Sequence, residues 1–96
     1  MIVTYHFKVQ GDITQILKHY DARSRRLGDE FWAELIALIK VASHTPERFR
    51  LDSASGLRRA NLKKFPYNFL FKVVDDKIRI VVVRHNKRHP NVGTKR

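Results

Sequence analysis

The sequence predicts an α+β protein in the order β-α-α-β-β-β, with a helical hairpin packed on one face of a small antiparallel sheet. Two observations carry this prediction. Apolar residues recur at helical spacing through much of the first half, and runs rich in β-branched and aromatic residues follow in the second half. A chain of 96 residues suffices for one domain, so we treat residues 1–96 as a single unit that ends in a basic tail, 86–96.

The first two elements are a strand and a helix. Residues 2–9 are rich in Ile, Val, Tyr and Phe, which favours a strand, and Gly11 ends it. Asp12 is a suitable helix N-cap, and Gln15 three residues later completes a capping-box pattern. We therefore expect a first helix from Asp12 to about Arg26.

A second helix follows after a short corner. Leu27-Gly28 marks that corner, and the carboxylates of Asp29 and Glu30 suit the positive end of a helix dipole. Thr45-Pro46 ends the helix. A short connection between two amphipathic helices predicts an antiparallel hairpin, and residues 45–56 then read as a connecting loop.

Three strands are expected at about 57–63, 67–74 and 78–85, with Asp75-Asp76-Lys77 as a tight turn between the last two. Only Arg79 is polar between positions 78 and 83, which indicates a central strand covered on both faces. Period-two spacing places four apolar side chains on one face of the preceding strand, as a floor for the helices: Tyr67, Phe69, Phe71 and Val73. We expect Phe31, Leu35, Phe69 and Phe71 to be buried between hairpin and sheet, and the opposite sheet face to be open.

Positive charge is concentrated in the second half of the chain. The net charge is +11, yet residues 1–56 hold eight Lys/Arg against seven Asp/Glu, a balance of +1. Residues 57–96 hold twelve Lys/Arg and only two acidic residues, Asp75 and Asp76, a balance of +10. Such asymmetry indicates an anionic partner, either nucleic acid or an acidic protein.

Composition also narrows the protein class. Cysteine is absent, which excludes disulfides and Cys-based metal sites and favours a reducing cytoplasm. The longest apolar run, residues 80–83, is far too short to span a bilayer, so we expect no membrane association. His85 and His89 have no third ligand nearby, and the four glycines are scattered. We therefore expect no metal and no cofactor.

Three segments resemble the RelE/ParE toxin superfamily, in particular its ParE-like "plasmid stabilisation" group. The first segment is Leu27-Gly28-Asp29-Glu30-Phe31 together with Pro46-Glu47-Arg48-Phe49. The second is Arg58-Arg59 leading into Lys64-Phe65-Pro66-Tyr67. The third is Val83-Arg84-His85-Asn86-Lys87-Arg88-His89-Pro90, which is close to a His-x-x-Arg-x-Pro ending. Their order and spacing agree over nearly the whole chain, and the predicted element order is also that of the superfamily.

The resemblance implies the toxin of a type II toxin–antitoxin system, a growth inhibitor neutralised by a cognate acidic antitoxin. ParE-like members of the superfamily are described as poisoning DNA gyrase, whereas RelE-like members cut mRNA on the ribosome. We expect a ParE-like toxin that acts through gyrase. The alternatives are a RelE-like, ribosome-dependent mRNA endonuclease and, in a different class, a basic RNA-binding module.

The candidate site residues are basic and polar. Surfaces that bind the antitoxin or the target are expected to use Arg58, Arg59, Asn61, Lys63, Lys64, Arg84 and Arg88. On a regular strand Arg59, Asn61 and Lys63 would share one face and form a row that binds anions. If the protein cleaves RNA, the catalytic candidates are Arg59, Lys63, Arg84 and His85, because cleavage needs charge stabilisation and proton transfer without a metal.

Two departures from the RelE-like pattern favour the ParE-like interpretation. Val92-Gly93 stands where many relatives carry an aromatic residue, so a platform for base stacking is missing. The basic half also has no isolated carboxylate that could act as a base, since Asp75-Asp76 is explained by the turn. Whether the chain is an enzyme stays open. If it is one, it is a metal-independent endoribonuclease.

Overall fold

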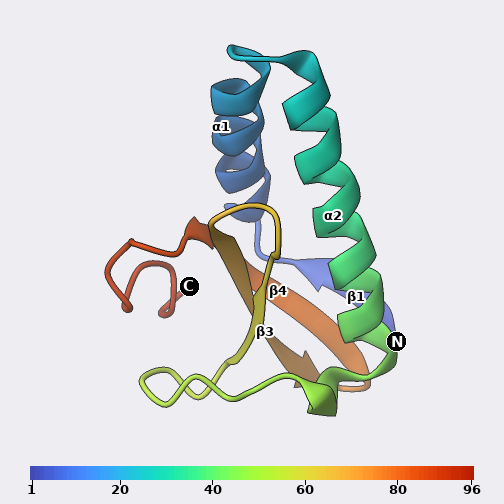
Figure 1. Ribbon diagram of the computed structural model, residues 1–96. Helices are drawn as coiled ribbons and strands as arrows, with labels where there is room; N and C mark the ends of the chain where they lie inside the picture. The colour runs from blue at the N-terminus through green and yellow to red at the C-terminus, as the bar shows by residue number, and fades with distance from the viewer.

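The computed structural model describes residues 1–96, and its two helices cover one face of a four-stranded sheet (Figure 1). The elements in chain order are β1 (Ile2–Tyr5), α1 (Val9–Asp21), α2 (Arg25–His44), a 3-10 turn η1 (Pro46–Arg48), β2 (Arg58–Asn61), β3 (Tyr67–Val74) and β4 (Lys77–His85). The predicted order of strands and helices is confirmed. No helix combines the length and the apolar character that a bilayer span requires.

The strands lie in the order β1-β4-β3-β2, so β4 is central as predicted. The neighbouring pairs β2–β3 and β3–β4 are antiparallel, but β1 pairs with β4 in parallel. The sheet is therefore mixed rather than wholly antiparallel. Parallel neighbours need a long crossover connection, and the helical hairpin and the two other strands between β1 and β4 provide one.

The core lies between the hairpin and the sheet. Phe31 and Leu35 of α2 and Phe69 and Phe71 of β3 have no exposed surface, which confirms the predicted packing face. Val73, at the far end of the same face, remains 43% exposed because it lies near the turn, beyond the cover of the helices. Period-two alternation in β3 therefore identified the floor of the core, though not where the helices stop covering it.

The predicted start of the first helix was wrong. Helix α1 begins at Val9, and the residue before it, Lys8, already has helical backbone angles. Asp12 therefore lies inside the first turn, where its carboxylate is free to bond elsewhere in the molecule. The first strand is correspondingly shorter than 2–9 and ends at Tyr5.

The predicted corner between the helices was also misplaced. Helix α1 ends at Asp21, and Ser24, in an extended conformation, precedes α2 as its N-cap residue. Gly28 lies inside α2 and is buried. A Cβ at this position would lie 1.9 Å from Asp21 Oδ1, so no larger residue fits without a shift of that side chain. The glycine thus permits a close approach of the two helices and does not end one of them.

The strand predictions held in the C-terminal half, with one exception. Strand β3 has the predicted bounds, and β4 begins one residue earlier than expected. Asp75 and Asp76 have φ angles of 51° and 59°, the left-handed pair that a two-residue hairpin turn requires. Strand β2 spans only Arg58–Asn61, not 57–63, because the chain turns away after Asn61.

Candidate functional site

The sheet face opposite the hairpin is partly covered by the C-terminal tail, not fully open as expected (Figure 1). Arg84 projects from β4 under this tail and is only 5% exposed. Its guanidinium donates to the carbonyl oxygens of Pro90 at 2.7 Å and Val92 at 2.9 Å. Gly93, at φ 76°, packs so closely on Val82 that a Cβ would lie 2.5 Å from a side-chain methyl. Arg84 is therefore an anchor for the tail.

A β-bulge in β4 adds a second anchor. The register shifts so that Leu70 pairs with Val82 and Phe71 with Ile80, which leaves Val81 as the extra residue. The Val83 N–H next to the bulge donates to Asp12 Oδ2 at 3.1 Å, and Arg96 Nη1 donates to the Val81 carbonyl oxygen at 3.1 Å. Arg96 also binds both carboxylate oxygens of Asp12, at 2.6 and 2.9 Å. Helix α1, the bulge and the end of the tail are thereby joined.

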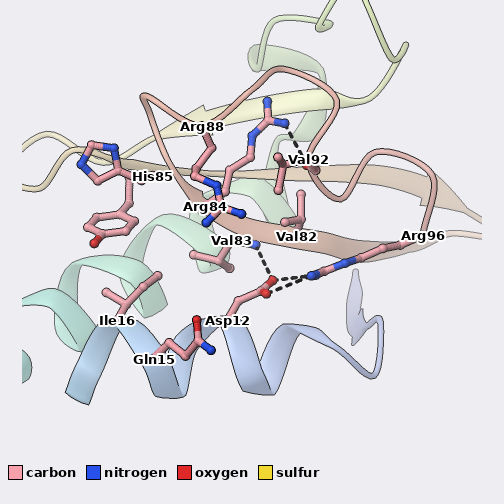
Figure 2. A pocket seen from close by; sticks show the side chains of 11 residues that line it. Asp12, Gln15, Ile16, Val82, Val83, Arg84, His85, Arg88, Val92 and Arg96 are labelled. Carbon is pink, nitrogen blue, oxygen red and sulfur yellow. Dashed lines mark hydrogen bonds and ion pairs between the residues drawn. The ribbon is translucent and has the colours of Figure 1, made fainter. Parts of the chain in front are cut away.

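A polar groove of about 280 Å³ lies between α1, the end of β4 and the tail (Figure 2). Its lining residues are Asp12, Gln15, Ile16, Tyr67, Val82, Val83, Arg84, His85, Arg88, Val92 and Arg96. The groove brings together three residues that the sequence singled out, Arg84, His85 and Arg88. Of these, only Arg88 is exposed.

His85 is half-buried at the end of β4. Its ring packs edge-on against Tyr67, with the centroids 5.0 Å apart, and its Nδ1 accepts the Lys87 N–H at 3.0 Å. That bond leaves Nε2 as the ring nitrogen with no partner in the chain. The position therefore combines a structural contact with one nitrogen that could exchange a proton.

The predicted row on β2 holds two residues instead of three. Arg59 and Asn61 share a face, and Arg59 Nε donates to Asn61 Oδ1 at 2.9 Å. Lys63 lies beyond the end of the strand, where the backbone N–H groups of Lys63 and Lys64 donate to the carboxylate of Glu34 in α2. Both lysine side chains are exposed at this turn, apart from the Arg59 row.

Arg58 lies on the other face of β2. It is half-buried, and its guanidinium donates to the Phe49 carbonyl oxygen at 2.7 Å, which ties the loop after η1 to the sheet.

Arg59 lies near Arg84. Burial first, and then the positive charge of Arg59, lowers the pKa of Arg84 below its ordinary value. The predicted basic residues therefore divide into anchors and free cations.

Sequence reasoning missed several residues of these surfaces. Asp12 was interpreted as a helix cap, and Arg96 as part of the basic tail. The two residues are 84 positions apart in the sequence, yet they form an ion pair. Arg48 and Arg50 were assigned to a loop, yet they line a polar hollow together with Arg59. No spacing in the sequence links these residues, because the contacts depend on the bulge and on loop geometry.

Most of the positive charge is unpaired within the chain. The structure holds two ion pairs, an exposed one between Arg26 and Glu30 and a mostly buried one between Arg96 and Asp12. The other eighteen of the twenty Lys and Arg residues form none. The chain thus carries a large excess of cations that no ion pair within it neutralises.

An apolar groove of about 610 Å³ runs between the outer sides of the two helices and the end of β1. Eight of its eleven lining residues are hydrophobic, among them Phe7, which is 79% exposed, and Trp32, which is 45% exposed. Exposed aromatic side chains that rim a groove are typical of a surface that binds another protein.

Comparison with known proteins supports the fold. No protein-family model matches the chain, and no curated protein matches it by sequence. A solved structure described as the chromosomal ParDE TA (toxin–antitoxin) system from P. aeruginosa is similar to it, with a TM-score of 0.78 and 18% sequence identity. The similar region covers 88% of this chain and 95% of that chain. The similarity confirms the predicted α+β fold, with two helices packed on a four-stranded sheet.

Proposed function

We propose that the chain is the toxin of a type II toxin–antitoxin system, that it is ParE-like and inhibits growth through DNA gyrase, and that a small acidic antitoxin neutralises it. One observation carries the proposal. A chain with a net charge of +11 and eighteen unpaired cations has the fold seen in a ParDE toxin–antitoxin structure.

The surfaces of the chain support an antitoxin partner. An amphipathic helix could place its apolar side chains in the groove beside Phe7 and Trp32, while acidic residues of the same partner meet the basic face. Antitoxin segments that fold on binding need apolar anchors as well as charge, because ordering the segment costs conformational entropy.

The positions of Arg84 and Val92 support the ParE-like activity over RNA cleavage. Both tail contacts of Arg84 use its guanidinium, so this side chain is occupied by protein carbonyls instead of a phosphate. Val92 offers no aromatic surface for a base. Asp12, the carboxylate beside the groove, already binds Arg96 through both oxygens and accepts the Val83 N–H, so its oxygens are occupied within the chain.

The RelE-like alternative has one observation in its favour. His85, Arg88 and Tyr67 line the same groove, which brings an imidazole ring and an exposed guanidinium into one site. Such a pair could move a proton and stabilise phosphate charge in metal-independent RNA cleavage.

Antitoxin binding is tested by co-expression with the product of the neighbouring reading frame, followed by purification through a tag on one partner. We expect a stable complex at moderate salt. A Trp32→Ser variant should weaken capture, whereas Trp32→Phe should retain it, because the aromatic anchor is kept. A partner that fails to co-purify with the wild-type chain would show that the toxin–antitoxin assignment is wrong.

The two activities are separated by expressing the chain without its antitoxin. Primer extension on cellular mRNA is run beside a supercoiling assay with purified gyrase and purified toxin. Inhibited supercoiling with intact mRNA is the expected result. Codon-phased cuts by the wild type would instead establish the RelE-like activity if the cleavage rate of Arg59→Ala is roughly 100- to 1000-fold lower. Arg25→Ala, an exposed arginine on the hairpin, is the matched control.

A further inference from the structure

Three arginines line a polar hollow of about 680 Å³ beside β2, which we call the arginine hollow. Its lining residues are Arg48, Phe49, Arg50, Leu51, Asp52, Ser53, Arg59 and Asn61. The hollow lies between the loop after η1 and the edge strand β2. In Figure 1 this loop lies at the opposite end of the molecule from the connection between α1 and α2. Neither Arg48 nor Arg50 takes part in the polar groove.

Backbone pairing holds the arginine hollow in shape. The Arg59 N–H donates to the Arg50 carbonyl oxygen at 2.9 Å, and Leu51 forms an isolated antiparallel bridge with Arg58. The Asp52 N–H donates to the Leu57 carbonyl oxygen at 2.6 Å. The loop therefore extends the sheet like a short extra strand, so the arginines on it are carried by a fixed backbone and little ordering is needed on binding.

The arginine hollow holds more cations than anions, three guanidiniums against the single carboxylate of Asp52. None of the three guanidiniums forms an ion pair. The one carboxylate in the hollow, Asp52, accepts both the backbone N–H and the hydroxyl of Ser55 through Oδ2, at 3.1 and 2.6 Å. Arg84 lies near the hollow, since burial first and then the charge of Arg59 lower its pKa, while the charge of Asp52 raises it. The site is therefore strongly cationic and attracts anions.

Guanidinium groups match phosphate oxygens because their planar N–H forks donate two parallel hydrogen bonds. We propose that the arginine hollow binds phosphate groups of a nucleic-acid backbone. This goes beyond the toxin assignment and does not depend on it. An acidic peptide is the less suitable ligand, since only Phe49 and Leu51 offer apolar contact here, whereas the groove beside Trp32 is mainly apolar.

The test measures binding of the purified chain to fluorescent oligonucleotides by anisotropy over a series of salt concentrations. Single-stranded DNA, single-stranded RNA and duplex DNA are the three probes. The Arg48→Gln/Arg50→Gln double variant is compared with Arg23→Gln/Arg25→Gln, which removes the same charge from exposed arginines beside the helix connection. All four positions are exposed, and thermal unfolding checks that each variant is folded.

Losing two phosphate contacts should reduce the slope of log K against log salt by about 1.4 for a single strand. If the variant and the wild type bind equally at about 1 M salt, this change in slope means roughly a 25-fold lower affinity of the variant at about 0.1 M salt. The control variant should change the slope little. An Arg48→Lys/Arg50→Lys variant should recover the salt slope, because the charge returns, but only part of the affinity, because the planar fork does not.

Three results would overturn the proposal. The hollow is not the binding site if the double variant and its control lose affinity equally, because net charge alone then explains binding. It is not a nucleic-acid site if none of the three probes binds the wild-type chain. It is a protein-binding surface instead if the double variant keeps its oligonucleotide affinity but no longer captures an acidic partner. None of these assays uses gyrase, so the toxin assignment is tested separately.

Discussion

The ion pair between Asp12 and Arg96 should be a main energetic link between the tail and the body of the protein. The perturbation is a double-mutant cycle of Asp12→Ala and Arg96→Ala. Both side chains are mostly buried, at 16% and 17% exposure, and the carboxylate also accepts the N–H of Val83 at the bulge. Removing either partner leaves a charge and a backbone group without their bonds.

The expected magnitudes follow from these contacts. Asp12→Ala removes two charged contacts to Arg96 and the bond from the Val83 N–H, so unfolding free energy should fall by about 3 kcal/mol. Arg96→Ala removes one residue at the end of the tail and should cost about 2 kcal/mol. We expect a coupling free energy of about 1.5 kcal/mol, above the range of about 0–1 kcal/mol for exposed pairs.

The assay is urea unfolding of the wild type, both single variants and the double variant. The exposed pair Arg26–Glu30, with side chains 86% and 42% exposed, is a control within the same protein. Its cycle should give only about 0.3–0.5 kcal/mol, the range of pairs four residues apart on a helix. The reasoning is refuted if the Asp12–Arg96 coupling is no larger than that of the control pair.

Two further predictions concern the core and the tail. Phe69→Ala should reduce the free energy of unfolding by about 3–5 kcal/mol, because the ring is fully buried, and near-wild-type thermal unfolding would contradict the packing. Gly93→Ala should loosen the tail, because φ 76° is strained for alanine and its Cβ meets Val82. Amide hydrogen exchange in residues 91–95 should then be faster, and unchanged exchange would mean that the tail is held elsewhere.

Much of the fold could be predicted because local patterns and burial agree in the second half of the chain. The alternation in β3 and the continuous apolar run in β4 each specify a strand, and Asp75-Asp76 suits the turn that joins them. In the first half, residues with two roles misled the interpretation. Asp12 has the chemistry of a cap but bonds to β4 and Arg96, and Gly28 has the chemistry of a helix end but serves close packing.

The candidate site was less predictable, because charge in the sequence does not show which cations are free. Arg84, Arg59 and Arg88 were equally basic candidates. The structure buries the first under the tail, orients the second through Asn61, and leaves the third exposed. The bulge at Val81, whose carbonyl oxygen accepts a hydrogen bond from Arg96, has no signature in a run of four apolar residues.

The division of the arginines changes how loss of activity in a variant should be interpreted. Arg84 and Arg96 donate to backbone carbonyls, so replacing either one releases the tail and alters the groove around His85 and Arg88. A loss of toxicity in those variants is therefore no evidence for a contact with the target. Arg88 is exposed and has no ion pair, so its replacement tests recognition without disturbing the anchors. Because burial separates the two groups, stability measurements must accompany every activity assay on this basic face.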